Sequence, residues 1–193
     1  MDVALKEWAV VVEALACGRQ CLLLRKGGIV EGRRGFEVRH PAFLFFPGIE
    51  HQHESFIRDE EKGLFARARA LYDPGRLQVR IYADVVDVFT APDDPARLLS
   101  ATQLHIWNER YIQQRYEYRP DLPLCVLLLR AQRLPHLVEL PMRSSYAGCK
   151  SWVNLTEDVD VTGAAPVLSD DAFAAVRAAV IDSLALNAAQ PRL

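Results

Sequence analysis

The sequence predicts an α+β fold built on a mainly antiparallel sheet that could curl into a barrel-like shape, with flanking helices and a C-terminal helix. Short apolar runs bounded by glycine and proline dominate the first half of the chain, which is typical of strands joined by turns. Strand-like and helix-like segments do not alternate regularly, which argues against a parallel doubly wound sheet. A helical apolar stripe recurs only at the end of the chain, after an acidic stretch.

Length and composition are those of an ordinary globular domain. The chain has 193 residues, of which 50% are hydrophobic and 25% charged, and its formal net charge is −2. Disorder is therefore excluded, and no overall positive charge is available to hold nucleic acid, although local basic patches remain open. We divide the chain into a single α+β domain over residues 1–155, and an acidic linker with a C-terminal helix packed on it over 156–193.

The sequence gives no sign of a leader or a membrane span. Charges at Asp2, Lys6, Glu7 and Glu13 interrupt the first apolar stretch, and no run approaches the roughly 18 apolar residues that a span needs. The four cysteines form no CxxC pair, which argues against a zinc site or a disulfide framework. We expect a soluble, cytoplasmic, reduced protein without a membrane partner.

Elements of the first half follow from apolar periodicity and turn residues. The segment before Gly18 is a strand or a short helix, and residues 21–24 form a strand after the turn. Residues 36–40 alternate like a strand, and the apolar run 42–46 is a second strand, closed by Pro47-Gly48. The pattern over 54–70 is helical.

In the second half, the strongest strand signals lie at 76–89 and 124–134. Asp93-Asp94-Pro95 is typical of a helix start, and the aromatic, polar segment 105–118 predicts another helix. Residues 146–155 read as a turn entering a strand, and Ser169 is placed to cap the final helix.

Histidines and glutamates surround the apolar run at 42–46. Glu37 and His40 precede it, and Glu50 and His51 follow it at the end of the predicted strand. Imidazole and carboxylate together suit acid–base chemistry, and we name these four residues as catalytic candidates. A divalent metal is possible as a cofactor, but no spacing assigns a ligand, since HExxH is absent. A polar network at a strand end, or a solvated loop, is the structural alternative.

Basic residues beside glycines or tryptophans are the second kind of candidate. Arg25 and Lys26 precede Gly27-Gly28, where backbone amides and cations can approach a phosphate together. Lysines near tryptophans could hold a phosphate while the indole stacks on a base or sugar. The alternatives are a solvated turn and tryptophans packed in the core. The ligand-binding candidates are Lys6, Trp8, Arg25, Lys26, Gln52, Lys150 and Trp152.

Other chemistries find less support in the sequence. Cys149 as a nucleophile would need a neighbouring base, which the sequence does not show. Trp107, Tyr111 and Tyr118 make a helical stripe that is usually packing, although the interleaved arginines leave nucleic-acid contact open. The lysine of a PD-(D/E)xK nuclease is missing, and no GxSxG motif is present.

Several long motifs resemble a known family. The segments ALKEWAVVVEAL, LLLRKGGI, FEVRHPAFLFFPGIEHQ, VLLLRAQRL and YAGCKSWVNL resemble, in this order, the bacterial domain of unknown function 1802. The resemblance runs from about Leu5 to Leu155, and we expect the tail after Leu155 to lie outside it. It implies a bacterial protein and no established reaction.

Three functions follow as hypotheses. The first is the binding or processing of a phosphate-bearing ligand such as nucleic acid or a nucleotide. The second is a metal-dependent hydrolase centred on Glu37, His40, Glu50 and His51, and the third is a noncatalytic interaction protein. The first two require folding to gather the charged ends of separate strands into one solvent-accessible hollow.

Overall fold

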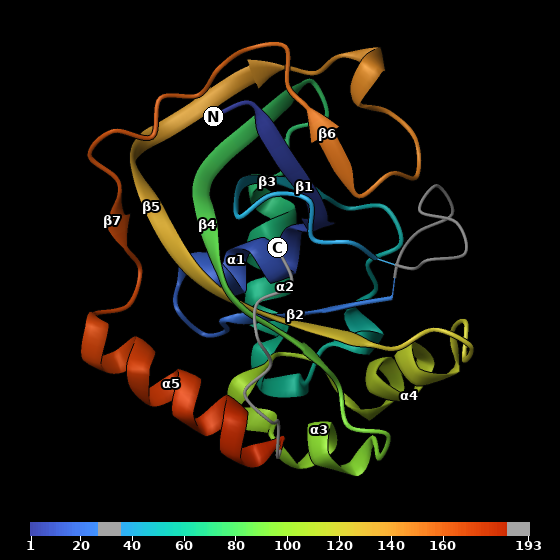
Figure 1. The fold of residues 1–193 in the computed structure, drawn as a ribbon. Helices are drawn as coiled ribbons and strands as arrows, with labels where there is room; N and C mark the ends of the chain where they lie inside the picture. The colour runs from blue at the N-terminus through green and yellow to red at the C-terminus, as the bar shows by residue number, and fades with distance from the viewer. Residues whose placement is uncertain (27–35, 185–193) are drawn as a thin grey trace.

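A seven-stranded sheet organises the computed structural model, which describes residues 1–26 and 36–184 (Figure 1). The sheet path is β2-β5-β4-β3-β1-β6, with β7 paired to β5. β1 and β3 pair in parallel, and every other pairing in the sheet is antiparallel. The strands are β1 (Val3–Trp8), β2 (Leu22–Arg25), β3 (Ala42–Gly48), β4 (Arg76–Thr90), β5 (Cys125–Pro141), β6 (Trp152–Asn154) and β7 (Ala165–Pro166). The predicted α+β class and mainly antiparallel sheet are confirmed.

The sheet curls without closing into a barrel, so the barrel-like expectation is corrected. Its two end strands are short, four residues in β2 and three in β6, and no ladder joins them within residues 1–26 and 36–184. The Arg25 side chain crosses the opening instead. It donates to the Lys6 carbonyl at 3.3 Å and to Ser151 Oγ at 2.7 Å. Side-chain hydrogen bonds therefore stand where a barrel would have a backbone ladder.

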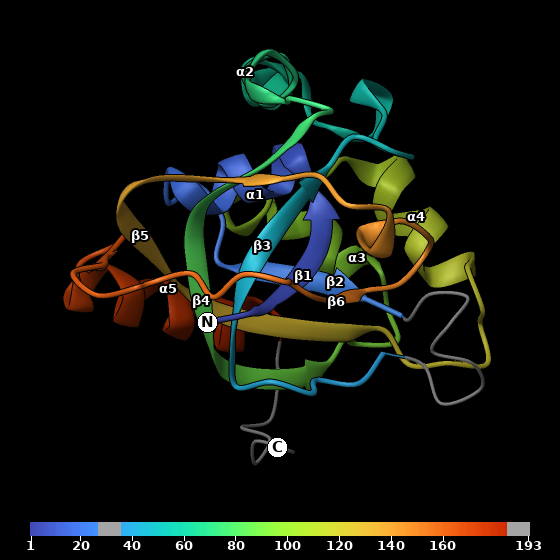
Figure 2. The same cartoon turned by 90° about the horizontal axis from the view of Figure 1, so that it is seen from above.

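Helices cover the ends and one side of the sheet (Figures 1 and 2). α1 packs against β3 and α2, and Figure 2 shows α2 standing outermost. Asn108 and Ser169 cap α4 and α5 by accepting from the amides of Tyr111 and Ala172. The helices are α1 (Ala9–Ala16), α2 (Lys62–Leu71), α3 (Ala96–Ser100), α4 (Glu109–Glu117) and α5 (Asp170–Ser183).

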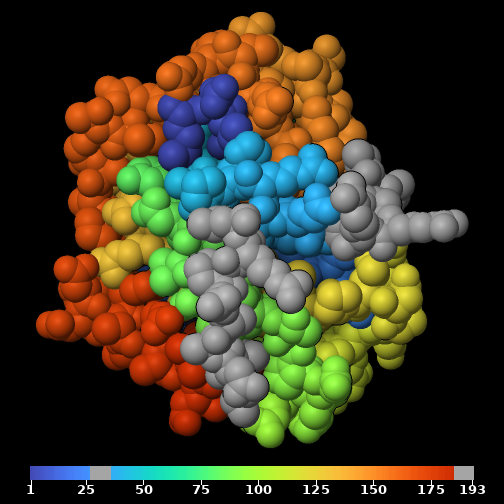
Figure 3. Space-filling view, in the orientation of Figure 1, coloured from blue at the N-terminus to red at the C-terminus, as the bar shows by residue number. Residues whose placement is uncertain are grey.

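Residues beyond 155 pack on the two hydrophobic cores of the preceding chain. Phe173 and Val180 of α5 are buried in the larger core, and Val159 is buried in the smaller one. Arg177 donates to both carboxylate oxygens of the buried Asp87, at 2.7 and 3.1 Å. In the space-filling view, the red α5 lies directly against neighbouring green and yellow segments of the sheet (Figure 3).

Most of the predicted elements are present, with one clear exception. The strands at 42–46, 76–89 and 124–134 and the helix within 105–118 are confirmed. The predicted strand at 36–40 is wrong, because this segment runs extended into β3 without pairing with any described strand. Its Phe36 is buried by stacking on Trp152 instead, with ring centroids 5.9 Å apart.

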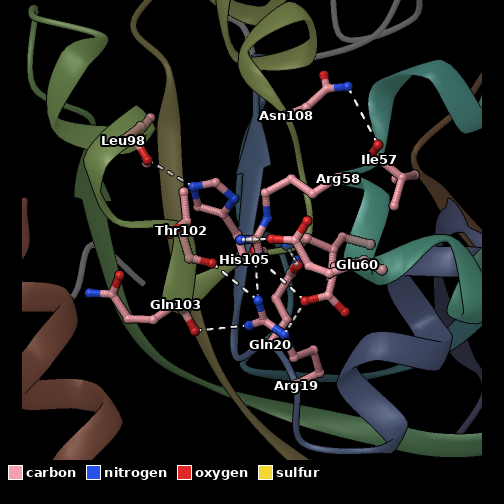
Figure 4. A network of polar contacts seen from close by, with 12 residues as sticks. Arg19, Gln20, Ile57, Arg58, Glu60, Leu98, Thr102, Gln103, His105 and Asn108 are labelled. Carbon is pink, nitrogen blue, oxygen red and sulfur yellow. Dashed lines mark hydrogen bonds and ion pairs between the residues drawn. The ribbon is translucent and has the colours of Figure 1, made fainter.

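A polar network ties the segment after α3 to the end of α1 (Figure 4). The Arg19 guanidinium donates to the carbonyls of Thr102, Gln103 and His105. His105 Nε2 lies 2.8 Å from the Leu98 carbonyl. The network thereby satisfies carbonyls that the irregular backbone leaves without partners.

Gly18 ends α1 with a left-handed residue, at φ 72°. The amide of Gly18 donates to the Leu15 carbonyl and that of Arg19 to the Ala14 carbonyl, at 3.1 and 2.9 Å, which is a Schellman motif. A Cβ at this position would lie 2.7 Å from Leu168 Cδ2.

We therefore expect Gly18→Ala to lower the free energy of unfolding by about 1–2 kcal/mol, because both the backbone conformation and the contact are unfavourable. Urea unfolding measures this change. Gly63→Ala is the matched control, since a Cβ there meets nothing within 4 Å inside α2, and it should be neutral or stabilising. Equal effects of the two substitutions would contradict the assignment.

Candidate functional site

A cleft of about 400 Å³ opens at the carboxyl ends of the parallel strands β1 and β3. The segment 147–151, Arg25 at the end of β2 and Arg115 of α4 form its other walls. Its lining consists of Lys6, Glu7, Trp8, Arg25, Phe46, Gly48, Glu50, His51, Arg115, Ala147, Gly148, Cys149, Lys150 and Ser151.

Strand register brings the first of these residues together. Lys6 pairs with Phe46 and Trp8 with Gly48 in the parallel ladder. Residues two apart in a strand share one face, so Lys6 and Trp8 lie on the same side of the sheet. The Lys6 amide donates to the Ser151 carbonyl at 2.8 Å, which fixes the segment before β6 beside them.

Arg25 is held by several groups at the inner wall of the cleft. Its guanidinium lies 3.0 Å from Glu7 Oε2 and 5.0 Å from the centroid of the Phe36 ring. The Arg25 and Glu7 side chains are only 17% and 10% exposed, so the pair is largely removed from water. The cation is oriented before any ligand arrives, which suits planar recognition of phosphate or carboxylate.

Two lysines contribute ammonium groups with spare donors. Lys6 Nζ donates to the Gly148 carbonyl at 2.9 Å, and Lys150 Nζ donates to the Ser145 carbonyl at 2.6 Å. Burial lowers the pKa of Lys6, while the Glu50 carboxylate opposes this and Lys150 reinforces it. Each ammonium has three donors and uses one on a carbonyl, so two remain for an anion.

Glu50 and His51 stand at the exposed edge of the cleft. Glu50 folds back over β3, so that a Cβ on Gly48 would meet its Oε2 at 3.0 Å. His51 is left-handed, with φ 62°, a conformation that side-chain-bearing residues rarely adopt. Such strain is concentrated at functional sites, and His51 is one of the residues that line the cleft.

Aromatic rings support the Trp8 side chain beside the cleft. Trp8 stacks on Phe56 with ring centroids 6.0 Å apart and meets the edge of Tyr111 at 5.2 Å. Arg115 Nε donates to Tyr111 Oη at 3.0 Å, and its guanidinium lies 5.1 Å from that ring. Trp8 is thus a supported indole, and its exposed part lines the cleft.

The structure divides the predicted residues into two groups. Lys6, Trp8, Arg25, Glu50, His51 and Lys150 line the cleft, whereas Lys26, Glu37, His40, Gln52 and Trp152 do not. Glu37 and His40 instead meet at Trp152, whose Nε1 donates to the Glu37 carbonyl at 3.2 Å and whose ring lies 5.0 Å from that of His40. Their roles in function stay predictions.

Lys26 and Gln52 are engaged in the interior. Lys26 is 4% exposed, and its Nζ donates to the carbonyls of Tyr116 and Arg119 at 2.8 and 3.3 Å. Gln52 is buried and accepts from the Val10 amide at 3.3 Å. These contacts position α4 and the start of α1 respectively. Gly27 and Gly28, which follow Lys26 in the sequence, lie outside the described residues.

A metal centre finds no support in the part of the chain that the structure describes. Within residues 1–26 and 36–184, no group of three or more histidine, cysteine, aspartate or glutamate side chains could hold a metal ion. The four proposed members of the His/Glu cluster are divided between the cleft and Trp152, which explains why they form no such group.

Sequence reasoning missed several lining residues, notably Glu7, Phe46, Arg115 and Ser151. Arg115 carried a partial signal, since it belongs to the basic and aromatic helix around Trp107. Glu7 and Ser151 carried none, because their importance comes from Arg25, which reaches them across the sheet opening.

No helix within residues 1–26 and 36–184 has the length and apolar character needed to cross a membrane.

Comparison with known proteins adds a family and no reaction. A family model described as a domain of unknown function, DUF1802, matches residues 4–179. The chain belongs to this family. The match extends past Leu155 into α5, so the expectation that the tail lies outside DUF1802 is wrong, and the burial of Val159 and Phe173 in the cores accounts for it. No curated protein and no solved structure matches this DUF1802 chain.

Proposed function

We propose that the cleft at the ends of β1 and β3 binds a phosphate-bearing ligand, a nucleotide or a segment of nucleic acid. Lys6, Lys150 and Arg25 contact the phosphate, and Trp8 stacks on the base. The observation that carries the proposal is the convergence of these four side chains, from two strands and a loop, on one cleft of about 400 Å³. That volume lies in the range of small-molecule sites.

Electrostatics support an anionic ligand. Four cations, Lys6, Arg25, Arg115 and Lys150, line the cleft against two carboxylates, Glu7 and Glu50. The lining therefore carries a net charge of +2, within a chain whose net charge is −2. One carboxylate, Glu7, is already paired with Arg25, so it orients a cation as well as neutralising it.

The edge of the cleft is equipped for acid–base work if the ligand is also processed. His51 supplies an imidazole and Glu50, next to it in the chain, supplies a carboxylate, and both line the cleft. No observation on the described residues favours the metal-dependent alternative. We therefore put forward ligand binding as the function. Any reaction on the bound ligand would take place at Glu50 and His51.

The test is binding of a fluorescent adenosine diphosphate, followed by anisotropy. We expect Lys150→Ala to weaken binding by about tenfold, because one charge-assisted hydrogen bond to phosphate contributes roughly 1.5 kcal/mol. Lys62→Ala is the matched control, since Lys62 lies on α2 and pairs with Asp59 at 2.7 Å, away from the cleft lining. Pyrophosphate should compete with the probe, and added salt should weaken binding.

Two results would contradict the proposal. The probe could fail to bind the folded protein at low salt, or Lys150→Ala and Lys62→Ala could weaken binding equally. Neither lysine is buried, so we expect both variants to keep the fold. A thermal melt of each variant checks this.

A further inference from the structure

Three hollows lie around α1 and the strand ends that precede it. The cleft already described reaches Trp8 and Gly48, and their chain neighbours Ala9 and Pro47 line a second, small hollow of about 30 Å³. A third hollow of about 320 Å³ shares Glu13, Ala16 and Arg80 with the second. We call the surface that contains these three hollows the α1 groove.

The far end of the α1 groove holds a second group of cations, oriented by fixed acceptors. Glu13 is only 4% exposed, and its carboxylate lies 2.8 Å from Arg67 Nε and 3.4 Å from Arg80 Nη1. Arg133 donates to the Ala16 carbonyl at the end of α1. Three arginines against one carboxylate leave this end with a net charge of +2.

Charge is therefore concentrated along the α1 groove as a whole. Eight lysines and arginines line the three hollows against four carboxylates, a net charge of +4. The whole chain has a net charge of −2, so this surface is set apart from the rest of the molecule. Glu13 lies underneath its arginines, which leaves the guanidinium groups on the outside, with Arg67 61% exposed.

We infer that the α1 groove binds single-stranded nucleic acid, a deepening that rests on the function proposed for the cleft. α1 has eight residues and is about 12 Å long, so the two cationic ends are too far apart for one nucleotide. A chain of four or more nucleotides can place successive phosphates at Lys6 and Lys150 and then at Arg67, Arg80 and Arg133. Such lengths are ordinary for one single-strand-binding domain.

The aromatic residues favour a single strand over a duplex. The middle hollow has room for only about one water molecule, so a bound strand crosses its mouth rather than filling it. Trp8 lines the first hollow and Tyr72 the second, and aromatic rings on which successive bases stack are the usual partners of unpaired strands. An acidic peptide could satisfy the charges but would make no use of these rings.

The experiment compares a labelled ten-nucleotide oligoadenylate, as RNA and as DNA, with fluorescent adenosine diphosphate. Arg67→Ala combined with Arg133→Ala should weaken oligonucleotide binding by about tenfold and leave diphosphate binding unchanged. The slope of log K against log salt should fall by about 1.4, since two phosphate contacts are lost at roughly 0.7 each. Arg80 stays beside Glu13 in this variant, so the buried carboxylate keeps a partner.

Arg97→Ala is the control, because Arg97 is an exposed arginine of α3 that lines none of the three hollows. It should change neither affinity. If the double variant bound the oligonucleotide and the diphosphate as tightly as the native protein, nucleic-acid binding along the α1 groove would be refuted. The function proposed for the cleft would not be affected. Tighter binding of a duplex, or equal competition by a ten-residue polyglutamate, would overturn the assignment to single strands. Failure of both probes on the native protein would instead refute the function proposed for the cleft.

Discussion

Lowering the pH from 6.5 to 4 should cost this protein about 3 kcal/mol of stability through His105 alone. Burial lowers the pKa of His105 to about 4, opposed by the hydrogen bond to the Leu98 carbonyl and assisted by the charges of Arg58 and Arg19. The imidazole is 1% exposed, so the folded protein holds it neutral, while the unfolded chain protonates it near 6.5. A shift of about 2.5 pKa units corresponds to roughly 3 kcal/mol.

The sign follows from proton counting. Between pH 6.5 and 4 the unfolded chain binds the proton and the folded chain does not, so stability is complete above 6.5 and is lost as the pH falls. Urea unfolding at several pH values measures the loss. The difference in the free energy of unfolding between the native protein and His105→Gln, as a function of pH, isolates the His105 contribution.

His105→Gln keeps a donor for the Leu98 carbonyl and cannot titrate. His136→Gln, at an exposed position of β5, is the matched control and should retain the full pH dependence. If the native protein and His105→Gln lost stability in parallel over this range, His105 would not be held neutral in the fold.

Arg19→Ala should lower the free energy of unfolding by about 3 kcal/mol, the second large effect that we expect. Arg19 pairs with Glu61, which is buried, and donates to three backbone carbonyls, those of Thr102, Gln103 and His105 (Figure 4). Removing it leaves several acceptors with fewer partners and weakens the compensation of a buried carboxylate. Arg58 still lies 3.1 Å from Glu61, which keeps the loss below that of a fully orphaned charge.

Arg19→Lys distinguishes geometry from charge. A lysine keeps the positive charge but cannot present the planar fork that reaches these separate acceptors, so it should recover less than half of the loss. Arg97→Ala serves as the exposed control, and urea unfolding at pH 7.5 measures all three variants. Full recovery with lysine, or a loss under about 0.5 kcal/mol with alanine, would show that the network contributes little.

Local signals were sufficient for the elements whose own residues decide them. The alternation of β4, the apolar run of β3 and the cap at Ser169 are each confirmed, because burial of one face and a local hydrogen bond act within a few residues. The segment 36–40 shows the limit. Its pattern alternates like a strand, yet it pairs with no described strand, and Phe36 is buried against Trp152 instead.

The candidate site was predictable in part for the same reason. Lys6, Trp8, Arg25 and Lys150 were singled out as cations and indoles able to hold a phosphate and a base, and the fold places all four in one cleft. Lys26 is the neighbour of Arg25 in sequence, yet it lies just past the end of β2 and points into the interior, where its Nζ donates to the Tyr116 carbonyl. Nothing local distinguishes the two.

Read alone, the sequence determined the α+β class, most strands and helices, and the types of side chain from which a phosphate site could be built. Only the tertiary structure decided which of these side chains meet. The parallel pairing of β1 with β3 and the reach of Arg25 across the open sheet join residues far apart in the chain. Periodicity records which face of an element is buried, but it carries no information about which element lies on the other side.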